Sequence, residues 1–254
     1  SFQIAYAPDN DGDRGNLVFI DRDERGVPLD AQSVFALVVS SELAWHKTRS
    51  HDMRRVTVVA NGPTSLRVDR ICDLFGVKLA RAEVGEANVV SLAHRLRTEG
   101  WTVPVLGEGS NGGNITPPST VRDPMSTLLS MIKLHAYDLG AFLSAQTTPG
   151  SISETADVSP SITQTSTGIF LDVARSLPPF CTLETDDARA KMDIGDTPHA
   201  VLKARYESML PTAVTPVLRT LKSTFGTEFE YHIYNYEGTK TTLGPGNRTG
   251  AERG

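Results

Sequence analysis

The chain has 254 residues, with 25 basic and 30 acidic side chains, a formal net charge of -5 and a sequence pI near 5.7. This length allows one or two domains with a substantial core, and the mild acidity, without a Lys/Arg-rich run, argues against a nucleic-acid partner. Two widely separated cysteines exclude a disulfide scaffold, and the lack of a signal-peptide shape or of a run of roughly 20 apolar residues predicts a cytoplasmic protein with no membrane partner.

The chain begins with an acidic loop, PDNDGDRG, from Pro8 to Gly15. Asp9, Asp11 and Asp13 alternate with single residues, so a folded loop would bring their like charges together at a Coulomb cost of roughly 1 to 4 kcal/mol per close pair. A hard divalent cation, which prefers oxygen ligands, would remove that cost. Because Asp, Asn and Gly also favour turns for local reasons, both a metal loop and a plain acidic surface turn fit the pattern.

Apolar patterning predicts alternating strands and helices after this loop. The predicted strands are 17–20, 56–60, 77–82 and 103–106, and the predicted helices begin after Asp30, at Pro63-Thr64, at Asn88 and at Asp123-Pro124. Their alternation indicates an α/β fold, with a mixed, mostly parallel sheet and helices on both faces.

Three of these helices, those at Pro63-Thr64, Asn88 and Asp123-Pro124, carry apolar stripes at helical spacing, which we expect to face the core. The stripe of the helix at Pro63-Thr64 includes Cys72, so we interpret this cysteine as a core residue rather than a nucleophile. The stripe of the last helix consists of Met125, Leu128, Leu129 and Ile132.

The composition changes in the second half of the chain. Residues 147–168 are rich in Ser and Thr without a period, which is typical of an exposed loop or insertion. A long helix is predicted near 198–224 and an aromatic-rich strand at 229–236, and together they suggest an incomplete α+β domain.

A second motif, GEGSNGG, spans Gly107 to Gly113. Its GxGxxG order is that of dinucleotide-binding loops, but the fingerprint needs a helix to open at the glycines, and the following Asn-Ile-Thr-Pro-Pro does not open one. In an extended segment Glu108 and Ser110 would point the same way and could bind neighbouring sugar hydroxyls. A glycine-rich turn with two incidental polar groups is the alternative.

Together, the two motifs resemble those of the α-D-phosphohexomutase superfamily, the phosphoglucomutases and phosphomannomutases. PDNDGDRG is similar to the metal loop DxDGDR of that family, and GEGSNGG to its sugar-binding loop GE-x-S-G. The motifs occur in the family's order and are followed by the pair Arg122-Asp123, and the resemblance covers roughly residues 4–135.

The resemblance implies a domain organisation and a set of site residues. Residues 1–27 would end the metal-binding domain, 28–146 would form the sugar-binding α/β domain, 147–175 a linker or insertion, and 176–254 an incomplete C-terminal domain. The expected Mg²⁺ ligands are Asp9, Asp11 and Asp13, and the expected substrate-binding residues are Arg14, Glu108 and Ser110.

The function implied by the resemblance is a Mg²⁺-dependent isomerase of the intramolecular phosphotransferase type. It would interconvert hexose 1-phosphate and hexose 6-phosphate through a phosphoserine and a bisphosphorylated intermediate. The partners expected are a hexose phosphate and the rest of the parent polypeptide. Glucose, mannose and amino-sugar phosphates all remain open as substrates.

The chain also departs from the family pattern. It has no TASHNP-like serine motif, so we expect no catalytic residue in this chain, a C-terminal fragment of its parent, and no turnover by the chain alone. The family's GFK loop reads VGEAN at 84–88, and its GGH reads GGN, ending at Asn114. A non-catalytic sugar-phosphate-binding protein and a generic Mg²⁺-dependent phosphatase stay open as alternatives.

Overall fold

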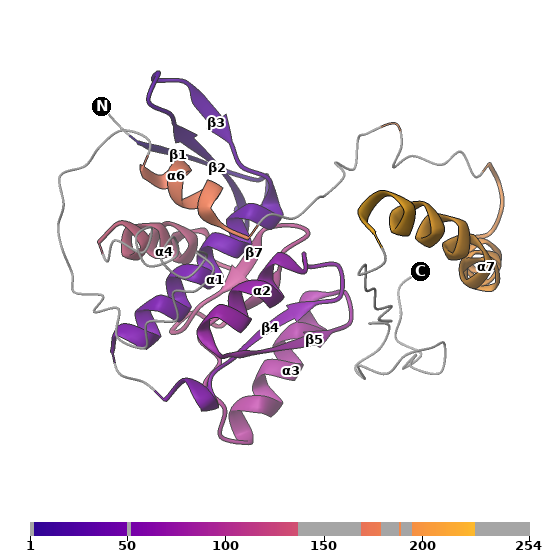
Figure 1. The fold of residues 1–254 in the computed structure, drawn as a ribbon. Coiled ribbons are helices and arrows are strands. Elements are labelled where there is room, and N and C mark those ends of the chain that lie inside the picture. The colour runs from indigo at the N-terminus through magenta and orange to yellow at the C-terminus, as the bar shows by residue number, and fades with distance from the viewer. Residues whose placement is uncertain (1–2, 50–51, 137–168, 179–187, 189–194, 227–254) are drawn as a thin grey trace.

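A computed structural model describes residues 3–49, 52–136, 169–178, 188 and 195–226 (Figure 1). The expected Ser/Thr-rich segment at 147–168 and the aromatic strand at 229–236 lie outside the described residues.

The N-terminal unit is a three-stranded antiparallel meander. Its strands are β1 (Ile4–Pro8), β2 (Gly15–Ile20) and β3 (Gly26–Pro28). The strand predicted at 17–20 is therefore confirmed as part of β2. Leu17 and Phe19 point to one face and are fully buried, so the meander packs into the same core as the helices that follow.

The second sheet has the strand order β5-β4-β6-β7. Its central strand β4 (Thr57–Asn61) runs parallel to β5 (Lys78–Ala82) and β6 (Leu106–Glu108), whereas β7 (Gly113–Ile115) is antiparallel to β6. The predicted mixed, mostly parallel sheet is confirmed, although the fourth strand lies at 106–108 rather than 103–106.

Helices cover both faces of this sheet (Figure 1). Successive side chains of β4 alternate between the faces: Val58 and Ala60 join the core cluster of α1 (Ala31–Thr48) and α2 (Arg67–Phe75), whereas Val59 joins that of α3 (Glu86–Thr98). All three side chains are fully buried, as expected for a strand covered on both sides.

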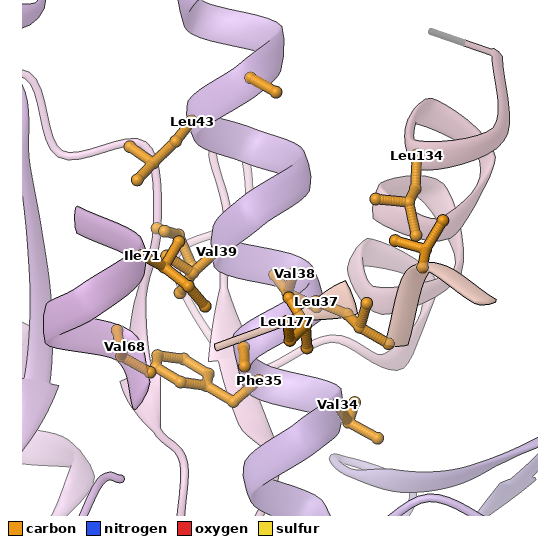
Figure 2. Packing of buried hydrophobic residues seen from close by; sticks show 14 of the residues in the cluster. Val34, Phe35, Leu37, Val38, Val39, Leu43, Val68, Ile71, Leu134 and Leu177 are labelled. Carbon is orange, nitrogen blue, oxygen red and sulfur yellow. The ribbon is translucent and has the colours of Figure 1, made fainter. Parts of the chain in front are cut away.

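Helix α1 is the central helix of the fold (Figure 2). It begins where the sequence predicts, because the Asp30 carboxylate accepts a hydrogen bond from the Ser33 backbone N–H at 2.9 Å. The side chains from Ser33 to Ala44 are all buried, so α1 is enclosed by α2, α4 and the two sheets. A helix that is buried all round is stabilised mainly by packing.

The predicted starts of two helices are wrong. Residues 61–64 form a turn in which the Asn61 side-chain oxygen accepts from the Thr64 N–H at 3.1 Å, and α2 begins only at Arg67. Helix α3 begins at Glu86 after Gly85, and Asn88 does not cap it, because its amide donates to the Val84 carbonyl at 2.9 Å. Asn and Thr side chains compete for backbone partners in this way near helix ends.

Helix α4 (Pro124–Ala136) starts as predicted, but of its four predicted stripe residues only Leu128 packs against the core. Met125, Leu129 and Ile132 are 56%, 52% and 61% exposed. The face that packs against α1 combines Met131 and Leu134 with small and polar side chains. These include Ser130, whose carbonyl accepts from the Ser41 hydroxyl at 2.6 Å, so small serines let the two helices approach closely.

This assignment of the α4 faces predicts a difference between two neighbouring truncations. Leu134→Ala should lower the free energy of unfolding by about 2–4 kcal/mol, because the side chain is 2% exposed and its removal leaves a cavity. Ile132→Ala, at a side chain that is 61% exposed, should change it by less than about 0.5 kcal/mol. Urea unfolding of both variants measures the two values, and the opposite ranking would contradict the structure.

The remaining described elements are η1 (Met53–Arg55), α6 (Ile169–Ser176) and α7 (His199–Phe225). All of helix α6 except its last residue, Ser176, lies within the residues assigned to the linker, and it packs on β2 through Phe170, whose ring centroid is 5.3 Å from that of Phe19. Helix α7 confirms the long helix predicted near 198–224, and it lies apart from the α/β unit (Figure 1).

Within the described ranges, none of the helices has both the length and the apolar content that crossing a bilayer requires.

Candidate functional site

The acidic loop is the tip of the β1–β2 hairpin. Two backbone hydrogen bonds close it, from Asp9 N–H to the Arg14 carbonyl at 2.9 Å and from Gly12 N–H to the Asp9 carbonyl at 3.1 Å. Gly12 has φ of 73°, a conformation that glycine adopts without strain. One carboxylate oxygen from each of Asp9, Asp11 and Asp13 lies within 4.8 Å of the others, so the structure brings together the three predicted ligands.

Arg14 partly neutralises this cluster. Its Nε lies 2.9 Å from Oδ2 of Asp9 and 3.3 Å from Oδ1 of Asp13, and its backbone N–H donates to Oδ1 of Asp9 at 3.2 Å. Partial desolvation raises the pKa of Asp9, but the hydrogen bonds and charge of Arg14 outweigh it, so the net pKa lies below its usual value. Asp9 is therefore ionised, as a metal ligand has to be.

Two oxygen atoms beside the loop lack a hydrogen-bond partner among the described residues. They are Oδ1 of Asp13 and the hydroxyl of Tyr6, and both are buried. Burial, and then the charges of Asp9, Asp123 and Asp13, raise the pKa of Tyr6, so its phenol stays protonated. Buried oxygens that accept no hydrogen bond, beside a carboxylate cluster, fit a small hard cation such as Mg²⁺, although Arg14 forms an ion pair with Oδ1 of Asp13 in this structure.

Glu108 lies at the carboxyl end of β6 and is 6% exposed. Its Oε1 accepts from the Asn61 amide at 2.9 Å and from the Gly85 N–H at 2.8 Å, and its Oε2 accepts from the Asn111 amide at 2.9 Å. A carboxylate has about four acceptor positions, so about one on Oε2 is available for a ligand. Glu108 thus organises three loops at this edge of the sheet.

Ser110 lies two residues further on and is exposed. Its Oγ is 3.4 Å from the same Asn61 amide nitrogen that donates to Glu108. The two side chains from the glycine-rich motif are therefore neighbours, and Ser110 presents the more accessible oxygen.

Asn61, which sequence reasoning missed, lies at the centre of this region. Besides Glu108, it contacts Thr64, whose hydroxyl donates to the Asn61 side-chain oxygen at 2.6 Å and accepts from the Gly109 N–H at 2.9 Å. One signal was available: Asn61 is the polar end of the strand VTVVAN, and the carboxyl ends of parallel strands form ligand sites.

Arg81 was also missed, and its role is structural. The guanidinium donates to the carbonyls of Asn61, Gly62 and Thr64 at 3.0, 3.0 and 2.8 Å, and its side chain is 2% exposed. It fixes the loop that holds Glu108. The apolar strand pattern offered no signal for a buried arginine here.

Arg122 joins the acidic loop to the loops around Glu108. Its Nη2 lies 2.6 Å from Oδ2 of Asp13, and its Nε lies 3.0 Å from Oε2 of Glu86. Glu86 directly follows Gly85, whose N–H binds Glu108. The two motifs, about 100 residues apart in the sequence, are therefore parts of one polar region.

The glycine-rich loop does not open a helix. Gly113 begins β7, whose residues pair antiparallel with β6. The dinucleotide-binding interpretation, which needs a helix N-terminus at the glycines, is therefore excluded by the structure.

Comparison with known proteins agrees with this architecture. Residues 32–156 match the family described as phosphoglucomutase/phosphomannomutase, alpha/beta/alpha domain III. No curated protein sequence matches the chain.

Several solved structures are similar to this chain. A Thermus thermophilus protein assigned as a phosphomannomutase is 24% identical, with a TM-score of 0.39, over 51% of this chain and 26% of that one. The Paramecium phosphoglucomutase pp63/parafusin is 16% identical, with a TM-score of 0.41, over 61% of this chain and 23% of that one. The Aspergillus fumigatus N-acetylphosphoglucosamine mutase in complex with GlcNAc-6P and magnesium is 14% identical, with a TM-score of 0.36, over 68% of this chain and 32% of that one.

The chain spans only 26% and 23% of the first two of these proteins. The family match covers the sheet β4–β7 with its helices and includes Glu108 and Arg122. With residues 32–156 matched to domain III of the phosphoglucomutases and phosphomannomutases, this α/β/α domain of the chain belongs to the α-D-phosphohexomutase superfamily.

Proposed function

We propose that this chain binds Mg²⁺ at Asp9, Asp11 and Asp13 and a hexose phosphate beside Glu108 and Ser110. The whole protein would then act as a phosphohexomutase, interconverting hexose 1-phosphate and hexose 6-phosphate through a phosphoserine and a bisphosphorylated intermediate. The observation that carries the proposal is the contact of Arg122 with both Asp13 and Glu86, because it joins the acidic loop to the segment that holds Glu108.

The roles of the chain's residues follow from their positions. Bound Mg²⁺ would supply positive charge to a phosphoryl group, whose transfer depends on positioning and charge neutralisation. Arg14 would contact the substrate once the cation takes over its interaction with Asp9 and Asp13. The open acceptor position of Glu108 and the Ser110 hydroxyl would bind hydroxyls of the sugar and so orient it.

Glu108→Gln is the variant that tests the sugar site. Glutamine retains the shape and one acceptor, whereas alanine would leave the buried donors of Asn61, Gly85 and Asn111 without their partner. We expect the affinity for glucose 1-phosphate or mannose 1-phosphate, measured by calorimetry with Mg²⁺ present, to fall about tenfold in Glu108→Gln and about fivefold in Ser110→Ala.

Ser208→Ala is the matched control, because this exposed serine on α7 donates to the Arg205 carbonyl of its own helix, its one hydrogen bond among the described residues. Unchanged affinity in both site variants, with wild-type melting temperatures, would refute the sugar site. Mutase activity of the complete protein then separates the enzyme from a sugar-phosphate-binding protein, since the latter binds without conversion.

A further inference from the structure

Arg122 lies between the proposed metal site and the proposed sugar site, and its charge acts on both. Its side chain is 21% exposed and its guanidinium lies between two carboxylates, Asp13 on the β1–β2 loop and Glu86 in the first turn of α3. The first segment belongs to the three-stranded sheet, whereas the second belongs to a helix that packs on the four-stranded sheet. Both contacts are ion pairs, and Nε of Arg122 makes no hydrogen bond within the described residues, so the link depends on charge and on the rigid, planar shape of the guanidinium.

The contact also determines which oxygen of Asp13 can face a cation. Arg122 lies 2.6 Å from Oδ2, whereas Oδ1 is the buried oxygen that lacks a hydrogen-bond partner within the described part of the chain. The Arg14 Nε is 3.3 Å from this Oδ1. Arg122 therefore contacts one oxygen of the Asp13 carboxylate and leaves the other beside Arg14 in the acidic loop.

Gly113 leaves the space through which Arg122 passes. A Cβ at Gly113 would lie 2.6 Å from Cδ of Arg122, closer than real Cβ atoms approach, and 3.0 Å from Oδ1 of Asn111, which is a tight contact. Gly113 is fixed by its pairing with Glu108 in the β6–β7 ladder. The path of the arginine is thus set by the same strand pair that positions the sugar-loop glutamate.

We propose that Arg122 is a positioning residue that locks the acidic loop onto the sugar-binding loops and lowers the charge felt by the cation; the proposal rests on the proposed function. Its positive charge beside Asp13 opposes Mg²⁺ binding by Coulomb repulsion, and the same charge and the lock favour an anionic sugar phosphate. Loss of Arg122 therefore shifts the two affinities in opposite directions. A residue that only supported folding would lower both.

The test measures both ligands separately by calorimetry, with MgCl₂ and with glucose 1-phosphate as the probes. In Arg122→Gln we expect Mg²⁺ to bind about tenfold more tightly and glucose 1-phosphate, at saturating Mg²⁺, about tenfold more weakly. Arg122→Lys keeps the charge and should restore the Mg²⁺ affinity but only part of the sugar-phosphate affinity. The matched control is Arg95→Gln, because Arg95 is an exposed arginine on α3 whose ion pair with Glu99 is 4.0 Å long.

Gly113→Ala provides a second test of the proposal, because the added methyl group displaces the Arg122 side chain without removing its charge from the chain. The same opposite shifts, with a melting temperature close to that of the wild type, would support the proposal. Two affinities that fall together, or that stay unchanged in Arg122→Gln, would overturn it while leaving the proposed function intact. A wild-type chain that binds neither ligand would instead overturn the proposed function, and the role of Arg122 with it.

Discussion

Mg²⁺ binding should fall at least about 100-fold when Asp9 and Asp13 are both replaced by asparagine. Each substitution keeps an oxygen but removes a negative charge from a cluster whose carboxylates lie within 4.8 Å of one another. Near a protein surface, one such charge at about 4 Å contributes up to roughly 4 kcal/mol to the attraction of a unit charge, before dehydration offsets part of it. The loss of two charges therefore leaves little affinity.

Thermal unfolding gives a second measurement that does not depend on enzyme activity. A ligand that binds only the folded state stabilises it by RT ln(1 + [L]/Kd), so Mg²⁺ should raise the melting temperature of the wild type, and excess EDTA should reverse the rise. The Asp9/Asp13 variant should show no such response. A variant with Asp23 and Asp73 replaced by asparagine, two exposed acids away from the loop, controls for the change in net charge. An equal rise in melting temperature with Mg²⁺ in all three proteins would refute the proposed metal site.

Lys133→Met should destabilise the chain by about 3–5 kcal/mol, the cost of leaving a buried charge without its partner. Lys133 Nζ lies 2.8 Å from both carboxylate oxygens of Glu42, whose side chain is 5% exposed. The Ser130 hydroxyl, at 2.7 Å from Oε1, would be the remaining partner of Glu42 in the contacts described. The pair joins α4 to α1, so its loss also weakens the packing of α4.

The double variant Glu42→Gln/Lys133→Met separates the charge from the packing. Because both ionic partners are gone, we expect it to recover more than half of the stability lost in Lys133→Met. Urea unfolding gives the three free energies, with Lys222→Met on the exposed side of α7 as the control. A loss below about 1 kcal/mol in Lys133→Met would mean that the pair contributes no more than a surface salt bridge.

Local patterns in the sequence predicted the order and type of the elements well. The Asp30 cap, the buried strand VTVVA and the Asp123-Pro124 helix start all depend on neighbouring residues, so they can be read without the fold. The family resemblance was likewise carried by two short motifs, and the match to domain III bears it out. Where a competing local hydrogen bond existed, as between Asn61 and Thr64, the predicted helix start was displaced.

The faces of the elements were less predictable. The apolar stripe of α4 lies largely in solvent because the helix packs through Ser130, Met131 and Leu134, and because Lys133 reaches the buried Glu42. Hydrophobic periodicity assumes that the buried face is the apolar one, and a charged pair between helices breaks that assumption. Helix α6 was missed for a related reason: it is a short apolar segment within a polar region, and its packing on β2 stabilises it.

Residue types and spacing were enough to nominate the three aspartates and the pair Glu108 and Ser110, since adjacent residues in a loop or strand stay adjacent in space. They could not show that Glu108 is held by Asn61 and Gly85, or that Arg122 connects Asp13 to Glu86, because each of these contacts joins segments far apart in the chain. Such contacts exist only once the β-strands have paired and α1 has been enclosed. The sequence of each motif determines which chemical groups it offers, whereas the packing of distant segments determines the distances between the motifs.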